Sequence, residues 1–126
     1  MMLIEMDKLV GKVFVSYEIC QYKEFIKFFD CEGNCYIFYH DIECCEQVYI
    51  DDICGDLDDL LFTAILKSEM ISSEMSEDEL NQKEAYNEWG EWYFYKLDTI
   101  KGGVTLRWCG ISTNYSTKVV IEHISN

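Results

Sequence analysis

The chain has 126 residues and a formal net charge of −14, and it is 49% hydrophobic and 15% aromatic. Disordered acidic tails are poor in aromatic residues, so this composition predicts a folded chain, and the length suggests one domain over residues 1–126. There is no apolar run of about 18 residues and no apolar core of a signal peptide near the start. We therefore expect no membrane association and a cytoplasmic location.

The first half of the chain reads as a series of strands. In residues 13–19, Val13, Val15, Tyr17 and Ile19 alternate with Phe14, Ser16 and Glu18, which predicts a strand. Residues 22–29 and 35–40 are also predicted to form strands. The turn Glu32-Gly33-Asn34 separates the last two, so we expect these strands to pair as a hairpin. We expect a short extended segment over 47–51, and Gly55 then breaks the extended chain.

The second half adds the only helical signals. We expect one helical turn over 56–61 and a strand over 62–72, with a helix as the alternative there. A short helix should follow over 76–87, where Ser76 and Glu79 have the spacing of a capping box, and a mobile loop is its alternative. A strand over 91–100 turns at 101–103 onto a strand over 104–109, and 118–124 forms the last strand. This order predicts an α+β fold: a single domain built on an antiparallel β-sheet, with one or two short helices.

The negative charge is concentrated in one block. Residues 28–91 hold eighteen Asp and Glu against two lysines, a formal charge of −16. Such a block repels nucleic acid and membrane surfaces and attracts basic proteins. Closely spaced carboxylates can also imitate the phosphates of duplex DNA. The candidate partner-binding residues are Asp41, Glu43, Glu46, Asp51, Asp52, Asp56, Asp58 and Asp59, with the acids at 74 and 77–79 behind them.

A second set of residues suggests small-ligand binding. Arg107 is the only arginine in the chain and can clamp a phosphate, while an aromatic neighbour stacks on a base. This alternative predicts a sponge that sequesters a cyclic nucleotide, and its candidate residues are Arg107, Trp108, Tyr115 and Trp92. The plainer interpretation is that the arginine pairs with an acid and the aromatic strand residues belong to the core.

Metal binding and catalysis have weaker support. His40 and the seven cysteines supply zinc-type ligands, namely Cys44 and Cys45 with Cys31, Cys35 or Cys54. Paired Cys-x-x-Cys elements are absent, however, and adjacent cysteines on an extended chain point to opposite faces. A nucleophilic cysteine needs an electropositive neighbourhood, whereas the acidic block provides the reverse. We expect reduced, mostly buried thiols, no metal, no cofactor and no enzymatic activity; a zinc-stabilised adaptor is the third hypothesis.

Several of these residues also carry a resemblance. Two elements, over 40–56 and 92–116, resemble a family of small, uncharacterised phage-encoded domains. The matching residues are His40-Asp41, Cys44-Cys45-Glu46, Val48, Asp52-Ile53, Gly55-Asp56, Trp92, Phe94-Tyr95-Lys96, Lys101-Gly102, Val104-Thr105-Leu106-Arg107-Trp108 and Tyr115-Ser116. The resemblance covers about residues 40–124 and brings no known activity, but it implies a phage context inside a host cell. Small acidic phage proteins often oppose host defence, which is an argument by association.

The leading functional hypothesis is therefore a phage-type, anti-CRISPR-like inhibitor. Its acidic surface would enter the groove of a nucleic-acid-binding defence effector, without contacting nucleic acid itself. Homodimerisation is left open, because paired strands and exposed aromatic side chains would permit it.

Overall fold

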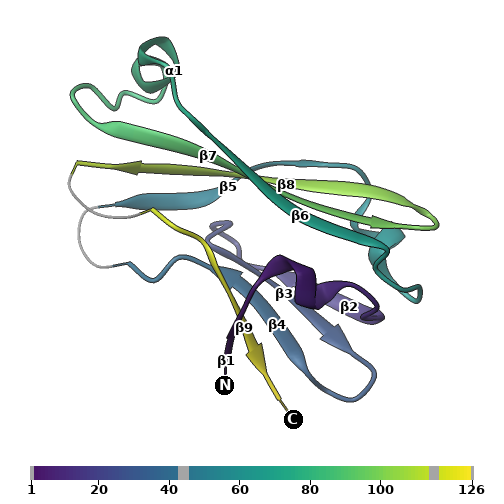
Figure 1. Ribbon diagram of the computed structural model, residues 1–126. Coiled ribbons are helices and arrows are strands. Elements are labelled where there is room, and N and C mark those ends of the chain that lie inside the picture. The colour runs from purple at the N-terminus through teal and green to yellow at the C-terminus, as the bar shows by residue number, and fades with distance from the viewer. Residues whose placement is uncertain (1, 43–45, 114–116, 126) are drawn as a thin grey trace.

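The computed structural model describes residues 2–42, 46–113 and 117–125, and it shows two antiparallel sheets packed face to face (Figure 1). The five-stranded sheet has the order β1-β9-β4-β3-β2 and the four-stranded sheet the order β5-β8-β7-β6. The strands of the first sheet are β1 (Met2–Ile4), β2 (Phe14–Ile19), β3 (Phe25–Asp30), β4 (Cys35–Tyr39) and β9 (Val120–Ile124). Those of the second are β5 (Gln47–Cys54), β6 (Lys67–Glu74), β7 (Trp89–Thr99) and β8 (Gly102–Ser112).

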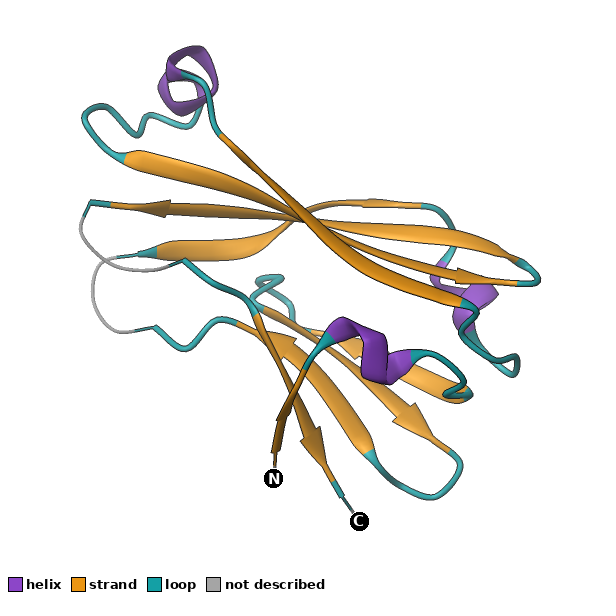
Figure 2. Cartoon of the chain, viewed as in Figure 1, coloured by secondary structure: helices purple, strands orange, loops and turns teal. Residues whose placement is uncertain are grey.

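Helical structure is confined to three short elements (Figure 2). The 3-10 helices are η1 (Met6–Leu9) and η2 (Leu57–Leu60), and the α-helix is α1 (Glu77–Gln82). The predicted α+β class is therefore wrong, and the fold is a β-sandwich. The layer that covers the inner face of the four-stranded sheet is the other sheet, because a helix of six residues is too short to bury such a face.

Alternation along the aromatic strand β7 explains how the sheets meet. Tyr93, Tyr95 and Leu97 alternate along the strand, point inward and are buried. They join one core cluster with Phe28 and Phe38 of the opposite sheet. Two phenols also cross between the layers: the Tyr93 hydroxyl lies 2.8 Å from the Thr117 hydroxyl, and that of Tyr95 donates to the Val119 carbonyl at 3.0 Å.

The expected helix over 76–87 is real but shorter. Ser76 accepts from the Glu79 amide at 3.2 Å and the Glu79 carboxylate accepts from the Ser76 amide at 3.0 Å, which confirms the capping box. The helix ends at Gln82, and Glu84 then adopts a positive φ of 57°. A residue in that left-handed conformation cannot continue a right-handed helix.

Candidate functional site

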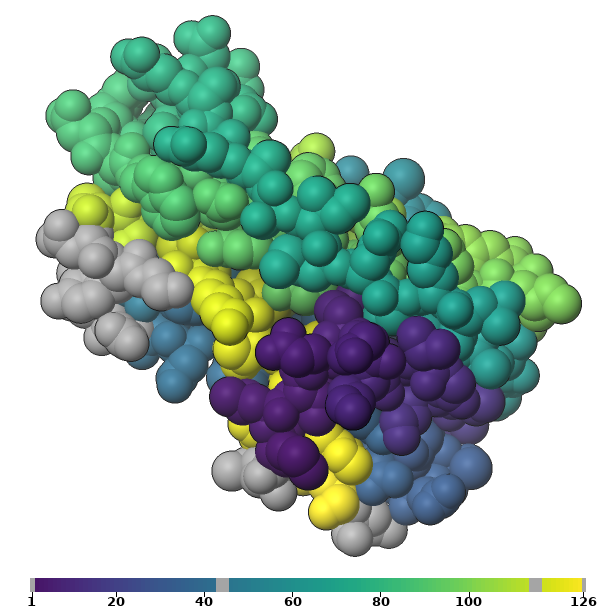
Figure 3. Space-filling view, viewed as in Figure 1, coloured from purple at the N-terminus to yellow at the C-terminus, as the bar shows by residue number. Residues whose placement is uncertain are grey.

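The α1 end of the molecule carries a large excess of negative charge. The strands β6 and β7 meet there, and the segment that joins them projects from the body of the molecule in Figure 3. Residues 74–91 contain seven acids and one lysine. We call these carboxylates the acidic end: Glu74, Glu77, Asp78, Glu79, Glu84, Glu88 and Glu91.

Packing against the outer face of the four-stranded sheet holds α1 in place. Met75 and Ala85 are buried against Trp92 and Cys109, with Leu80 half-buried beside them. The Trp92 indole also donates from Nε1 to Glu79 Oε2 at 2.8 Å. Backbone and indole hydrogen bonds to Glu79 hold the pKa of its carboxyl below the ordinary value. Glu79 therefore stays charged while it anchors the helix to the sheet.

The acidic end contains a like-charge pair across two strands. Glu74 of β6 lies directly opposite Glu91 of β7 in the antiparallel register. Facing carboxylates of this kind oppose strand pairing by a few tenths to about 1 kcal/mol. Neither has a salt-bridge partner within the described residues. A cation placed between them would remove this repulsion.

Lys83, the lysine of this segment, is engaged elsewhere. Its ammonium donates to Asp51 Oδ1 at 2.6 Å, and the Arg107 guanidinium donates to Asp51 Oδ2 at 2.5 Å. A β-bulge brings Asp51 to this position, because Ile50 and Asp52 pair with consecutive residues of β8 and Asp51 is the extra residue between them. Burial raises the pKa of the Asp51 carboxyl, but the hydrogen bonds from Lys83 and Arg107 outweigh it and lower the pKa.

The eight predicted partner-binding acids do not form one patch. This holds for the seven acids that the structure describes. Asp41 lies after β4 and Glu46 just before β5, whereas Asp56, Asp58 and Asp59 lie in or beside η2 at the opposite end of β5. An eight-residue strand spans roughly 26 Å, which separates these groups. Glu46 is buried and its carboxylate lies 3.2 Å from His40 Nε2, and Asp51 is paired as above. Asp52 is exposed, and Glu43 lies outside the described residues.

The predicted ligand-binding residues are also separated. Arg107 and Trp92 lie together on the outer face, with the guanidinium 4.9 Å from the centre of the indole ring. Trp108 points to the inner face and is fully buried, so it is not available to stack on a ligand. Tyr115 lies outside the described residues. Arg107 Nε is buried without a hydrogen-bond partner among the residues that the structure describes.

The zinc-type residues have other partners where they are described. His40 Nδ1 lies 2.6 Å from the Lys118 carbonyl and Nε2 lies 3.2 Å from Glu46, and both partners are acceptors. Both ring nitrogens of His40 are therefore engaged within the chain. No group of three potential metal ligands occurs among the described residues, and Cys44 and Cys45 lie outside them.

The described thiols differ in exposure. Cys35 and Cys109 are buried and Cys20 is half-buried, while Cys31 and Cys54 are exposed; the other two cysteines lie outside the described residues. Burial raises the pKa of the Cys35 and Cys109 thiols. Both are therefore poor nucleophiles at neutral pH.

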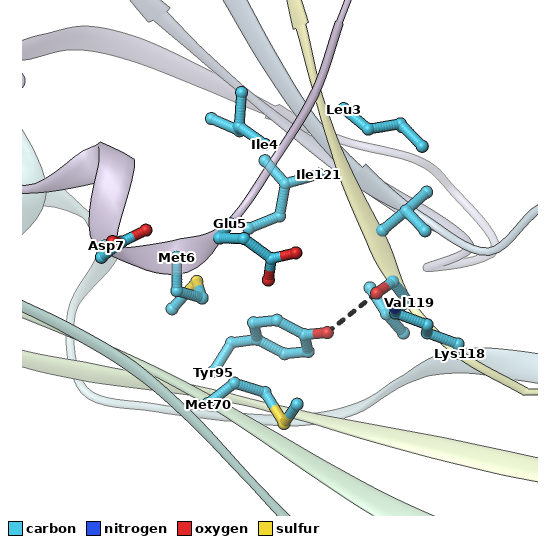
Figure 4. Close-up of a pocket in the computed structure, with 11 residues that line it drawn as sticks. Leu3, Ile4, Glu5, Met6, Asp7, Met70, Tyr95, Lys118, Val119 and Ile121 are labelled. Atoms are coloured by element: carbon cyan, nitrogen blue, oxygen red, sulfur yellow. Dashed lines mark hydrogen bonds between the residues drawn. The ribbon is translucent and has the colours of Figure 1, made fainter.

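Sequence reasoning missed a pocket beside the N-terminal segment. It lies between the two sheets next to β6, has a volume of about 430 Å³, and includes Glu5 and Asp7 in its wall (Figure 4). The sequence signal for this pocket was the pair of acids Glu5 and Asp7, which precedes the acidic block and was not predicted to form a site.

Comparison with known proteins identifies a family but no activity. None of the described helices has the length and apolar character needed to cross a membrane. No curated protein and no solved structure matches the chain. A family model described as a domain of unknown function, DUF7448, matches residues 7–121, so the chain belongs to the DUF7448 family.

Proposed function

We propose that the chain is a non-enzymatic inhibitor of a nucleic-acid-binding protein, which it engages at a basic groove through its acidic end. The observation that carries this proposal is the uncompensated charge of that end. Seven acids lie within residues 74–91, Lys83 is already paired with Asp51, and Glu74 faces Glu91 across two strands. A basic partner would relieve the repulsion that the free protein tolerates.

The surface that we propose for partner binding is the acidic end, and not the set of candidate acids between Asp41 and Asp59 that the sequence suggested. Asp51 and Glu46 have internal partners, and η2 lies at the far end of β5. The acids of α1 are different, because Glu77 and Asp78 are exposed and have no hydrogen bond or ion pair within the described residues. Carboxylates that make no hydrogen bond or ion pair within the described residues are available to bind a partner.

A defence effector is the partner that we propose. The grooves of nucleases and guide-dependent effectors are lined by Lys and Arg that bind phosphates. A chain of charge −14 would be attracted to such a groove over a Debye length of about 8 Å at physiological salt. Phage origin, which the sequence resemblance implied, would place the chain in the host cytoplasm and make it an anti-CRISPR-like inhibitor.

The nucleotide-sponge alternative is less well supported. Arg107 lies on the outer face of the four-stranded sheet together with Asp51 and Glu79. The Asp51 carboxylate already accepts a hydrogen bond from the Arg107 guanidinium. A phosphate would have to displace one carboxylate and approach another. The unpartnered Arg107 Nε is the one observation in its favour.

The test is displacement of labelled nucleic acid from a panel of purified defence nucleases, followed by fluorescence anisotropy. We expect one nuclease to release its nucleic acid, with an inhibition constant that weakens as salt rises. The combined variant Glu77→Gln, Asp78→Asn and Glu84→Gln should inhibit about tenfold less well, since three interfacial charges at about 0.5 kcal/mol each sum to that factor.

The matched control removes the same charge from other surfaces. Glu18→Gln, Glu24→Gln and Asp52→Asn neutralise exposed acids outside the acidic end, and this variant should inhibit as the wild type does. Equal losses in the two variants would reduce the effect to net charge. Failure to displace nucleic acid from any nuclease, or displacement that salt does not affect, would reject the proposal.

A further inference from the structure

The pocket beside β6 has an apolar floor and an acidic wall. Met6, Met70, Tyr95 and Ile121 contribute the apolar surface, and the Tyr95 hydroxyl is fixed by its bond to the Val119 carbonyl (Figure 4). The pocket opens where the N-terminal segment, β9 and β6 come together. Its volume of about 430 Å³ is sufficient for one or more long side chains.

The acidic residues that line this pocket outnumber its basic residues. Glu5 and Asp7 are exposed, and neither has a salt bridge within the described residues. The Glu5 side chain points into the cavity above the Tyr95 ring (Figure 4). Burial raises the pKa of the Tyr95 phenol far above its ordinary value, with smaller contributions from Tyr93 and Glu5. Lys118 lines the same pocket, so the two acids exceed the one base.

The rim of this pocket is an unpaired strand edge. β6 is the last strand of its sheet, and Met70 and Ile71 are 43% and 46% exposed. The Met75 amide donates to the Gly90 carbonyl, so odd-numbered residues bond to β7 and even-numbered residues direct their backbone groups outward. Met70 and Ser72 therefore direct their backbone N–H and C=O groups away from β7, beside the pocket. Such an edge accepts an extended chain as an added strand.

Within the proposed function, on which this inference rests, we infer that the partner binds through an extended basic segment that adds as a strand to β6 and places a Lys or Arg side chain in the pocket beside Glu5 and Asp7. The aliphatic stem of that side chain would contact Met70 and Tyr95, while its charged head would reach the carboxylates. Further along β6, the same segment reaches Glu74 and the acidic end. A single extended occupant thus accounts for the strand edge, the pocket and the facing Glu74–Glu91 pair.

The experiment uses a fluorescein-labelled nonapeptide of alternating lysine and valine and measures its binding by anisotropy. A second peptide has the same side chains and charge, but alternate backbone amides are N-methylated so that they cannot donate to a strand. We expect the first peptide to bind and the second to bind at least tenfold more weakly. Equal binding of the two would overturn strand addition.

Variants of the protein then locate the site. The double variant Glu5→Gln and Asp7→Asn should weaken the peptide at least tenfold, and Ser72→Pro should abolish binding. Proline is tolerated at an edge position whose N–H faces solvent, and circular dichroism checks that this variant folds. Ser72→Ala is its control and should bind normally. If Ser72→Pro does not fold, the comparison of the two peptides decides.

The outcomes separate this inference from the proposed function. If the variants at positions 5, 7 and 72 bind the peptide normally while the α1 variant loses binding, strand addition is wrong and the acidic-end proposal stands. If all variants bind alike and salt has no effect, both are wrong. Binding of lysine amide as tightly as the peptide would overturn the inference in favour of a small amine ligand.

Discussion

Asp51→Asn should destabilise the protein more than any other single loss of an acid in β5. The Asp51 side chain is 13% exposed and accepts from both Lys83 and Arg107. A hydrogen bond between charged groups contributes about 1.5–3 kcal/mol when buried, and we assign about 1 kcal/mol to each bond here because both cations are partly exposed. The expected loss in the free energy of unfolding is about 2 kcal/mol.

This loss converts into a measurable change in melting temperature. A chain of 126 residues has an unfolding entropy of about 0.26 kcal/mol/K, so 2 kcal/mol corresponds to a decrease in Tm of about 8 °C. Urea unfolding and a thermal melt at pH 7 measure the two quantities. The control is Asp52→Asn, which removes the same charge from the exposed neighbour in the same bulge and should shift Tm by less than about 2 °C.

The pH dependence provides the refuting result. The pKa of Asp51 is lower in the folded protein than its ordinary value of 3.8, so its contribution is fully present above that value and is lost as the pH falls through the folded-state pKa. The difference in stability between wild type and Asp51→Asn should therefore shrink below about pH 4. If Asp51→Asn and Asp52→Asn unfold alike at pH 7, or their difference grows with acid, the account of this ion pair is wrong.

Three further predictions concern the stability of the fold. Trp108→Phe should cost less than about 1.5 kcal/mol in urea unfolding, well below a typical large-to-small change, because the buried Nε1–H of Trp108 has no partner among the described residues. Ser76→Ala should remove the N-cap of α1, cost about 1 kcal/mol, and speed amide hydrogen exchange in that helix while leaving the strands protected. Gly55→Ala should destabilise by about 1–3 kcal/mol more than Gly11→Ala in the same urea assay: both glycines have a positive φ, but only at Gly55 would the added Cβ collide with the Gly103 carbonyl.

The positions of strands along the chain were predicted best where the alternation of side chains was strong. In the segment around Trp92, aromatic residues alternate over a whole strand, and the strand predicted over 91–100 lies within two residues of the observed limits, Trp89–Thr99. Where the pattern was short, it failed: β1 has three residues and shows no alternation that could reveal it. The strand expected over 62–72 begins at Lys67 instead, because residues 61–64 form bridges to the start of β2.

The site was predictable in composition but not in placement. The acidic block is visible in the sequence, yet β5 carries the chain from one end of the sandwich to the other and divides that block. Pairing between Asp51 and two cations distant in sequence depends on tertiary structure, as does the approach of Met70 to Glu5. Local patterns carry no information about such contacts.

The position of β9 has a consequence for how the protein folds. β1 pairs only with β9 among the described strands, and β9 lies between β1 and β4, so residues 2–4 meet their partner about 120 positions later in the chain. Closing so long a loop is entropically costly and slow. During synthesis β2, β3 and β4 can pair as they emerge, whereas β1 and the open edge of β4 must wait for the last strand. A ribosome-bound chain that stops before β9 would thus expose two unsatisfied strand edges, and we expect it to depend on chaperones until the final strand is released.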